Sequence, residues 1–371
     1  MVWQEGGQTH QALWGSRQLP PPRAVTVVDD TLRANAALAM LQQGQTLLWR
    51  GDYHNARQLL QALTRRLAQR QRAARADTTL LQRFHAGRLQ QAQQAALLGR
   101  LVIPFDETYR VPLRRAPDAA AAALAAWGEP SGPGLIPLRE WLGVIGAWQW
   151  RQRGVAVAAL DGATVHPHYG VFAPIRQEYL ALVAQAPLPT PCATALDLGT
   201  GTGVIAAILA RRGVTSVVAT DVQPQAVACA SANLERLVPA GMVDVVQHDL
   251  YPPDRRFDLV VCNPPWLPGK VSSPLDAAIY DPDARMLRGF LHGLAAHLTP
   301  AGEGWLILSD LAERIGLRAP DALTQLLAQA NLAVVEQHQI RPSHSRSRDA
   351  DDPLHEARAA EITSLWRLRP A

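Results

Sequence analysis

Short apolar runs alternate with longer amphipathic stretches in the second half of the chain, and this alternation predicts an α/β fold. Gly, Asp, Asn and Pro bound the runs, which is typical of buried parallel strands. Helices are predicted between the strands, for example from Val204 to Arg212, where Gly213 provides the stop. The five strands that we predict are Ala193 to Leu198, Val217 to Asp221, Met242 to Gln247, Phe257 to Cys262 and Gly304 to Ser309.

The first 164 residues show a less regular pattern. Val2 to Trp14 is predicted to form a hairpin, and Asn55 to Arg100 is predicted to be helical, with apolar residues at helical spacing. Further helices follow, and then a hairpin over Val155 to Val165. We therefore predict an N-terminal hairpin and a basic, mainly helical substrate-recognition region over residues 1–100, connecting helices and a hairpin over 101–164, and an α/β domain over 165–371.

The composition is that of an ordinary globular protein, with 48% hydrophobic and 18% charged residues. No apolar stretch is long enough to cross a bilayer, and Met1 to Glu5 lacks the basic and then apolar order of a secretory signal. Three widely spaced cysteines argue against a disulfide framework. We therefore expect a cytoplasmic protein with no membrane partner. Because no carboxylate or cysteine stands at ligand spacing near His166 and His168, we expect no metal site.

The positive charge is almost entirely arginine, since Lys270 is the only lysine and the formal net charge is +4. Arginines gather in the predicted helical region, where Asp77 is the single acidic residue. They are Arg57, Arg65, Arg66, Arg70, Arg72, Arg75, Arg83, Arg88 and Arg100. Clustered cations neutralise phosphates, which favours an RNA-contacting arm. A solvated helix pair in an arginine-biased protein explains the same residues, and both interpretations stay open.

A glycine-rich turn follows the first predicted strand of the α/β part. Asp197, Gly199, Thr200, Gly201 and Gly203 belong to this turn, which leads directly into a helix. Glycines let the backbone approach a ligand closely, and amides at a helix start favour negative groups. The glycines alternate, whereas a dinucleotide-binding turn has its third glycine one place later. The segment therefore indicates a cofactor-binding turn of another kind.

Acidic residues end the next two strands. Asp221 closes the second strand, where a carboxylate can accept both hydroxyls of a ribose, and Val222 follows it. Asp249 follows the third strand, where it can meet an adenine amino group, and Leu250 comes next. A single acid at a strand end is commonly a turn or helix cap. Two acids at successive strand ends after a glycine-rich turn predict a nucleoside-containing cofactor, bound by these four residues and the turn.

The fourth strand delivers Asn263, Pro264, Pro265 and Trp266. A planar amino group conjugated to a ring or carbonyl is a poor nucleophile, because its lone pair is delocalised. The Asn263 side-chain oxygen and the Pro264 carbonyl can accept its hydrogens and so direct the lone pair along a transfer axis. The prolines stiffen the turn, and Trp266 offers a flat wall. We predict that these four residues hold and activate a methyl acceptor, rather than form a simple proline turn.

From about Val165 onward, this ordered set of motifs resembles the class I S-adenosylmethionine-dependent methyltransferases. Within them it is similar to the small-methyltransferase group, which includes HemK-type protein-glutamine methyltransferases and N-methyltransferases of ribosomal RNA and of adenine in DNA. The resemblance implies a Rossmann-like, seven-stranded, mostly parallel sheet with an antiparallel last strand, and S-adenosyl-L-methionine as cofactor. By this likeness the glycine-rich turn would surround the methionine part, Asp221 the ribose and Asp249 the adenine, while Asn263 would border both cofactor and acceptor.

Two flanking stretches are similar to the HemK-type enzymes in particular. Phe172 to Glu178 is similar to their Pro-Arg-x-x-Glu segment, with different spacing, and Tyr280 to Leu287 is similar to Glu-Pro-x-x-Ala-Leu. Asp281 stands where that group usually has Glu, and Trp266 where it has Tyr or Phe, which leaves the acceptor open. The candidate substrate contacts are His168, Tyr169, Arg176 and Asp281.

The sequence thus predicts an S-adenosylmethionine-dependent N-methyltransferase that modifies a planar amino group of a macromolecule. The HemK-like flanks favour a glutamine side-chain amide in a translation factor or ribosomal protein. The basic region favours a base of ribosomal RNA, at guanine N2 or adenine N6. A non-catalytic module that binds the cofactor or RNA is disfavoured, because a pure binder has no need of the acceptor residues.

Overall fold

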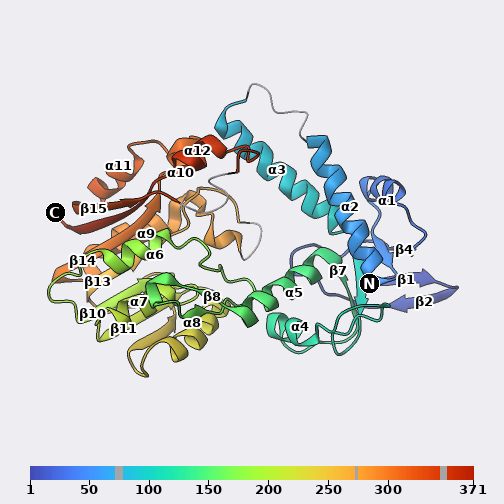
Figure 1. Ribbon diagram of the computed structural model, residues 1–371, viewed down its shortest axis with the longest axis horizontal. Helices are drawn as coiled ribbons and strands as arrows, with labels where there is room; N and C mark the ends of the chain where they lie inside the picture. Colours follow the sequence, from blue (N-terminus) through green and yellow to red (C-terminus); the bar gives the residue numbers. More distant parts are fainter. Residues whose placement is uncertain (72–77, 272–274, 343–348) are drawn as a thin grey trace. The chain divides into compact units, whose positions relative to one another are not determined.

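The computed structural model describes residues 1–71, 78–271, 275–342 and 349–371, which form two compact units, Met1–Gln149 and Trp150–Ala371 (Figure 1). No helix in these described ranges is long and apolar enough to span a membrane. The first unit contains β1 (Val2–Glu5), β2 (Gln8–Gln11), β3 (Leu13–Trp14), β4 (Thr26–Val28), α1 (Ala34–Gln42), β5 (Leu47–Trp49), α2 (Tyr53–Gln71), α3 (Leu80–Leu98), β6 (Leu101–Phe105), α4 (Ala120–Trp127), β7 (Gly134–Pro137) and most of α5 (Leu138–Arg153).

The second unit contains the longer run of alternating strands and helices. Its elements are β8 (Val155–Ala156), β9 (Thr164–Val165), α6 (Glu178–Gln185), β10 (Thr194–Leu198), α7 (Val204–Arg211), β11 (Ser216–Asp221), α8 (Pro224–Leu237), β12 (Val243–Gln247), β13 (Phe257–Cys262), α9 (Arg285–Leu294), β14 (Leu298–Ser309), α10 (Leu311–Ile315), α11 (Ala322–Gln329), β15 (Leu332–Ile340), α12 (His355–Ala360) and β16 (Thr363–Pro370).

The first unit is built on a five-stranded mixed sheet in the order β3-β7-β6-β5-β4. Strand β6, which is buried throughout, pairs in parallel with β5 and antiparallel with β7. The region predicted to be mainly helical therefore contains a sheet as well. The predicted boundary after residue 100 does not coincide with the junction of the two units, because it would separate β6 from its neighbour β5. Strands this short carry too little periodicity to be recognised in the sequence.

The predicted basic region consists of two helices, α2 and α3. Helix α3 begins with a capping box, in which the Thr79 hydroxyl accepts from the Gln82 amide and the Gln82 side chain accepts from the Thr79 amide. Of the arginines predicted to form an arm, Arg57, Arg65 and Arg66 lie on α2, and Arg83 and Arg88 lie on α3. Arg72, Arg75 and Asp77 lie outside the described residues.

The second unit is built on a seven-stranded sheet in the order β12-β11-β10-β13-β14-β16-β15. The first five of these strands pair in parallel, whereas β16 runs antiparallel to both of its neighbours. This architecture confirms the predicted Rossmann-like fold and its antiparallel last strand. The unit begins before residue 165, where the prediction placed it, because β8 and β9 form the expected hairpin within it.

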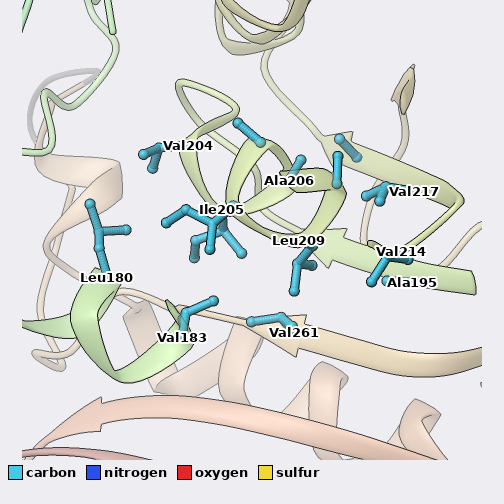
Figure 2. Close-up of a cluster of buried hydrophobic side chains, with 14 of the residues drawn as sticks. Leu180, Val183, Ala195, Val204, Ile205, Ala206, Leu209, Val214, Val217 and Val261 are labelled. Atoms are coloured by element: carbon cyan, nitrogen blue, oxygen red, sulfur yellow. The ribbon is translucent and has the colours of Figure 1, made fainter. Parts of the chain in front are cut away.

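Both faces of this sheet are covered by helices. Ala195 and Val261 point into a core shared with α6, α7 and α8, while Leu196 and Val260 point into a core shared with α9 and α11. In the first core, Ile205 of α7 lies among side chains of α6 and of the strands (Figure 2). Burial on both faces fixes the register of the strands, and with it the residues that stand at their carboxyl ends.

Candidate active site

The carboxyl ends of four parallel strands lie side by side in the second unit. Leu198 pairs with Thr220 on one side and with Cys262 on the other, and Asp221 pairs with Gln247. The segments that follow these residues therefore leave the sheet at one edge. This is the edge at which open α/β sheets bind ligands. It carries the glycine-rich turn, both predicted acids and the Asn-Pro-Pro-Trp segment.

The glycine-rich turn adopts positive φ angles, which residues other than glycine disfavour. Gly199, Gly201 and Gly203 have φ angles of 77°, 56° and 81°. The amides of Gly199 and of the next residue both donate to the Thr220 carbonyl at 2.9 Å, which ties the turn to β11. A Cβ at Gly201 would meet nothing within 4 Å, so the backbone faces open space there. A Cβ at Gly199 would lie 2.4 Å from Met286 Cε, so this methionine lies against the turn.

Asp197 is buried beneath the turn and holds it in place. Its Oδ2 accepts from the Thr200 hydroxyl at 2.6 Å and from the Ala206 amide at 3.0 Å, in the first turn of α7. Burial raises the pKa of Asp197 to about 7, although both hydrogen bonds act in the opposite direction. We therefore place Asp197 and Thr200 as supports of the cofactor-binding turn.

Asp221 stands at the tip of β11 with its carboxylate turned back to the turn. Oδ2 accepts from the Gly201 amide at 3.1 Å, and Oδ1 accepts from the Gln223 amide at 2.9 Å. Burial raises the pKa of this carboxyl. A carboxylate oxygen can accept more than one hydrogen bond, so each oxygen retains capacity for a ribose hydroxyl. Val222 is 55% exposed beside it.

Asp249 has a partner that the sequence did not indicate. Its carboxylate forms an ion pair with Arg285, at the start of α9. Leu250, with a φ of 64°, follows it, and its carbonyl accepts from the Thr220 hydroxyl at 3.1 Å. The segment after β12 is thereby tied to β11. An adenine amino group that approached Asp249 would have to share its carboxylate with Arg285.

The predicted acceptor residues are linked to one another by a hydrogen bond. The indole Nε1–H of Trp266 donates to Asn263 Oδ1 at 2.9 Å. Pro264 is buried and Pro265 is half-buried between them. An amide oxygen has two lone pairs, so Asn263 Oδ1 can accept one further hydrogen, as the predicted clamp requires.

Arg176 meets the acceptor segment from the chain that precedes α6. Its guanidinium carbon lies 4.8 Å from the centroid of the Trp266 ring. Nε donates to Glu178 at 2.7 Å, and Nη2 donates to Glu361 at 3.0 Å. The structure thus brings Arg176 to the predicted site, where its guanidinium contacts Trp266, Glu178 and Glu361.

The carboxylate of Asp281 accepts hydrogen bonds from the first turn of α9. Its two oxygens accept from the amides of Met286 and Leu287, at 3.0 and 3.1 Å, in the first turn of α9. It is 6% exposed. Both oxygens are directed to the helix start and satisfy amides that would otherwise lack partners, so Asp281 supports α9, and its contact with a substrate stays a prediction.

His168 and Tyr169 lie between β9 and α6, beside α8. The His168 amide donates to Cys229 Sγ of α8 at 3.3 Å. Burial, assisted by the charge of Arg151, lowers the pKa of His168 to about 4, so its ring is neutral at physiological pH. The role of these two residues toward an acceptor stays a prediction.

Three residues of this edge were not predicted as site residues. Arg285 and Met286 lie in the stretch that resembles HemK-type enzymes, which was the available signal. Glu361 is fully buried two residues before β16 and carries no sequence motif. It reaches the site only because β16 is antiparallel, which brings the start of that strand to the edge where the parallel strands end.

The residues at this edge fit a nucleoside-containing cofactor with a cationic centre. The turn is open at Gly201, and Asp221 has acceptor capacity within the same loop. Asp221 would hold the ribose, the glycine-rich turn would hold the amino-acid part, and Asp249 would meet the adenine. Within the described ranges, no group of three His, Cys, Asp or Glu side chains could hold a metal ion.

Comparison with known proteins agrees with this geometry. Residues 162–337 match the family model described as methyltransferase small domain. A stretch of 164 residues is 32% identical to the release factor glutamine methyltransferase of Cereibacter sphaeroides and covers 41% of this chain and 56% of that protein. A stretch of 121 residues is 34% identical to the tRNA1(Val) (adenine(37)-N6)-methyltransferase of Pedobacter heparinus and covers 31% and 52%.

A third relative matches over a shorter stretch. It is the ribosomal protein L11 methyltransferase of Pelotomaculum thermopropionicum, 47% identical over 74 residues, which are 20% of this chain and 24% of that protein. The chain spans about half the length of the first two relatives. Residues 162–337 are therefore similar to a methyltransferase small domain, which agrees with the resemblance of this part of the chain to the class I S-adenosylmethionine-dependent methyltransferases.

Proposed function

We propose that the protein transfers a methyl group from S-adenosylmethionine to the side-chain amide nitrogen of a glutamine, in a protein of the translation machinery. The observation that carries this proposal is the position of Asn263. Its segment leaves the sheet beside the glycine-rich turn, because Leu198 and Cys262 are register partners in β10 and β13. Residues suited to the cofactor and residues suited to a planar amide thus share one edge.

The chemistry requires orientation more than a strong base. When bound, S-adenosylmethionine supplies an electrophilic methyl group on a positively charged sulfur. Asn263 Oδ1 and the Pro264 carbonyl accept the two hydrogens of the acceptor amide and turn its lone pair toward the transfer axis. Nitrogen gains positive charge as the N–C bond forms and the C–S bond breaks, so both oxygens interact more strongly with the transition state than with the neutral amide. The nitrogen then releases one proton.

Glutamine is favoured by likeness to one group of relatives. The Cereibacter sphaeroides relative is named for methylation of a glutamine in a release factor. The stretches around Arg176 and Asp281, which resemble HemK-type enzymes, lie in the described site region as supports of Trp266 and of α9. A substrate in the translation machinery agrees with the expected cytoplasmic location.

An RNA base is the second candidate, for a specific reason. The Pedobacter heparinus relative is named for N6-methylation of a tRNA adenine, and the first unit carries exposed arginines on α2, including Arg57 and Arg65. An adenine amino group is planar and conjugated, so the same two acceptor oxygens suit it.

One labelling experiment separates the two candidates. Cofactor with a tritiated methyl group is offered to a lysate from a strain in which the gene is deleted, with the purified protein added. We expect label that protease removes and nuclease does not, and that total hydrolysis releases on N-methylated glutamine. The Asn263→Ala variant, which lacks one acceptor oxygen, is expected to transfer no label. Nuclease-sensitive label would contradict the glutamine proposal and support the RNA base. Absence of label from the wild-type reaction would contradict methyl transfer to either macromolecule.

A further inference from the structure

We propose that Arg176 is a positioning residue for the methyl acceptor. Held between two carboxylates, it fixes the ring of Trp266, and the indole N–H of Trp266 in turn fixes the carboxamide of Asn263. This inference rests on the proposed function and adds the residues that set the geometry of the acceptor clamp.

The first step is the anchoring of Arg176. Glu361 is fully buried, and its Oε1 accepts from Arg176 Nη2 at 3.0 Å and from the Ser309 hydroxyl at 2.6 Å. The Glu178 side chain is 5% exposed and accepts from Arg176 Nε at 2.7 Å. A buried carboxylate is costly without a cationic partner. The guanidinium of Arg176 lies between these two carboxylates. If Arg176 turned away, both carboxylates would lose its positive charge.

The anchors come from parts of the fold that are themselves rigid. Ser309 ends β14, a strand with neighbours on both sides. Glu178 begins α6, whose Leu180 and Val183 lie in the core against α7 (Figure 2). The guanidinium is therefore fixed from two sides of the sheet edge. Its position does not depend on the segment that carries Trp266.

The second step is the contact with the indole ring. The Arg176 guanidinium lies over the ring of Trp266, 4.8 Å from its centroid, and the Tyr179 ring meets it edge-on at 6.4 Å and 90°. A guanidinium over one face of the ring excludes a planar acceptor from that face. The acceptor is thereby directed to the remaining face or edge of Trp266.

The third step is the orientation of Asn263. The carboxamide of an Asn side chain can flip by about 180°, so that its NH₂ group takes the place of its oxygen. The flipped group would present hydrogen-bond donors to an acceptor amide. The indole N–H at 2.9 Å selects the orientation in which Oδ1 faces Trp266. The second lone pair of that oxygen then serves the acceptor. If the Trp266 ring tilts, Asn263 Oδ1 loses the indole N–H as a donor, and the Asn263 carboxamide can flip.

The test compares Arg176→Gln with the matched control Arg255→Gln. Arg255 also lies over an aromatic ring, that of Phe257 at 5.6 Å, but at the opposite end of β13 from Asn263. With tritiated cofactor and deletion-strain lysate as acceptor, we expect Arg176→Gln to lower the rate at saturating cofactor by at least about tenfold, the scale of a lost hydrogen bond in the transition state. Arg176→Lys should recover part of the rate, and Arg255→Gln should stay within about twofold of wild type.

Two further measurements separate positioning from a loss of folding or of cofactor binding. Calorimetry with S-adenosylhomocysteine should give the same affinity for Arg176→Gln and wild type. In protein labelled with ¹⁵N-tryptophan, the Trp266 indole N–H, assigned by its absence in Trp266→Phe, should exchange slowly with water in wild type and faster in Arg176→Gln. If Arg176→Gln does not fold, Trp266→Phe carries the test, because it leaves the arginine and both carboxylates paired. It should then lower the rate with unchanged cofactor affinity.

An unchanged rate or an unchanged indole exchange in Arg176→Gln would overturn the inference, and so would a loss explained by weaker cofactor binding. These outcomes differ from failure of the proposed function. If wild type methylates neither protein nor nucleic acid, the function is wrong, while indole exchange still decides whether Arg176 holds Trp266.

Discussion

The guanidinium of Arg285 is paired with the carboxylate of Asp249. Arg285 begins α9 and Asp249 follows β12, so the pair joins two segments that are 36 residues apart in the chain. Asp249 is the residue expected to meet the adenine of the cofactor. The pair is half exposed, with side-chain exposures of 64% and 46%, so breaking it requires little free energy.

We expect Arg285→Ala to bind the cofactor more tightly than wild type. The carboxylate of Asp249 would then be available to the adenine without competition, and an exposed ion pair is worth up to ~1 kcal/mol, or about fivefold in affinity. Calorimetry with S-adenosylhomocysteine at low salt measures the change, which should shrink at high salt. Arg288→Ala, on the same helix, is the control. Weaker binding by Arg285→Ala would contradict this expectation and place the arginine in contact with the cofactor.

Asp221→Ala is expected to weaken cofactor binding by about tenfold to a hundredfold, because hydrogen bonds to a charged acceptor contribute ~1.5–3 kcal/mol. Loss of the bonds to the Gly201 and Gln223 amides adds to the effect by loosening the turn. Isothermal calorimetry measures it. Asp244→Ala is the control, since this residue of β12 is 66% exposed. Equal affinities of Asp221→Ala and wild type would remove Asp221 from the cofactor site.

Asp197 should make the stability of the domain depend on pH. Its pKa is about 7 in the folded state and ~3.9 in an unfolded chain. Between these values the folded state holds a proton that the unfolded state has lost, so the free energy of unfolding falls by up to ~1.4 kcal/mol for each pH unit. The fall ends above about pH 7, where both states are ionised.

Asp197→Asn tests this dependence, because Asn retains an oxygen for Thr200 and Ala206 and does not titrate. The free energy of unfolding of the variant, minus that of wild type, should rise between pH 4 and pH 7 and then stay level. Denaturant titrations at several pH values measure the difference, with Asp244→Asn as the control. A difference that does not vary with pH would show that Asp197 is ionised throughout.

Asp281→Ala is expected to lower the free energy of unfolding by about 1–2 kcal/mol, the usual cost of losing a side-chain partner for helix-start amides. Both Met286 and Leu287 would lose their acceptor. Asp281→Asn should lose about half as much, because its remaining oxygen keeps one bond. Urea unfolding measures both variants. A substrate contact would instead lower the methylation rate and leave stability unchanged.

The strands of the second unit were predictable because they are apolar, bounded by turn residues and repeated in one order. Thr194 to Leu198 and Phe257 to Cys262 are buried on both sides, and such strands read as continuous apolar runs. The sheet of the first unit was missed for the opposite reason. Leu47–Trp49 has only three residues, and Gly134–Pro137 ends in a residue that sequence patterns assign to loops.

The site was predictable where its residues stand at the ends of predicted strands. The glycine-rich turn, Asp221 and the Asn-Pro-Pro-Trp segment each follow a strand, so their meeting at one edge follows from the topology. Partners far apart in the chain were not predictable. Arg176 meets Glu361 at a separation of 185 residues. Asp30 likewise accepts from the amide of Asp52, 22 residues further on.

The antiparallel strand β16 has a consequence for how the site is completed during synthesis. Every parallel strand of this sheet is translated before Glu361, yet this glutamate and the strand after it support the side of the site that faces the acceptor. Until that segment emerges from the ribosome, Arg176 and Trp266 lack one of their fixed neighbours. The acceptor side of the site is therefore complete only when the last strand of the sheet is in place.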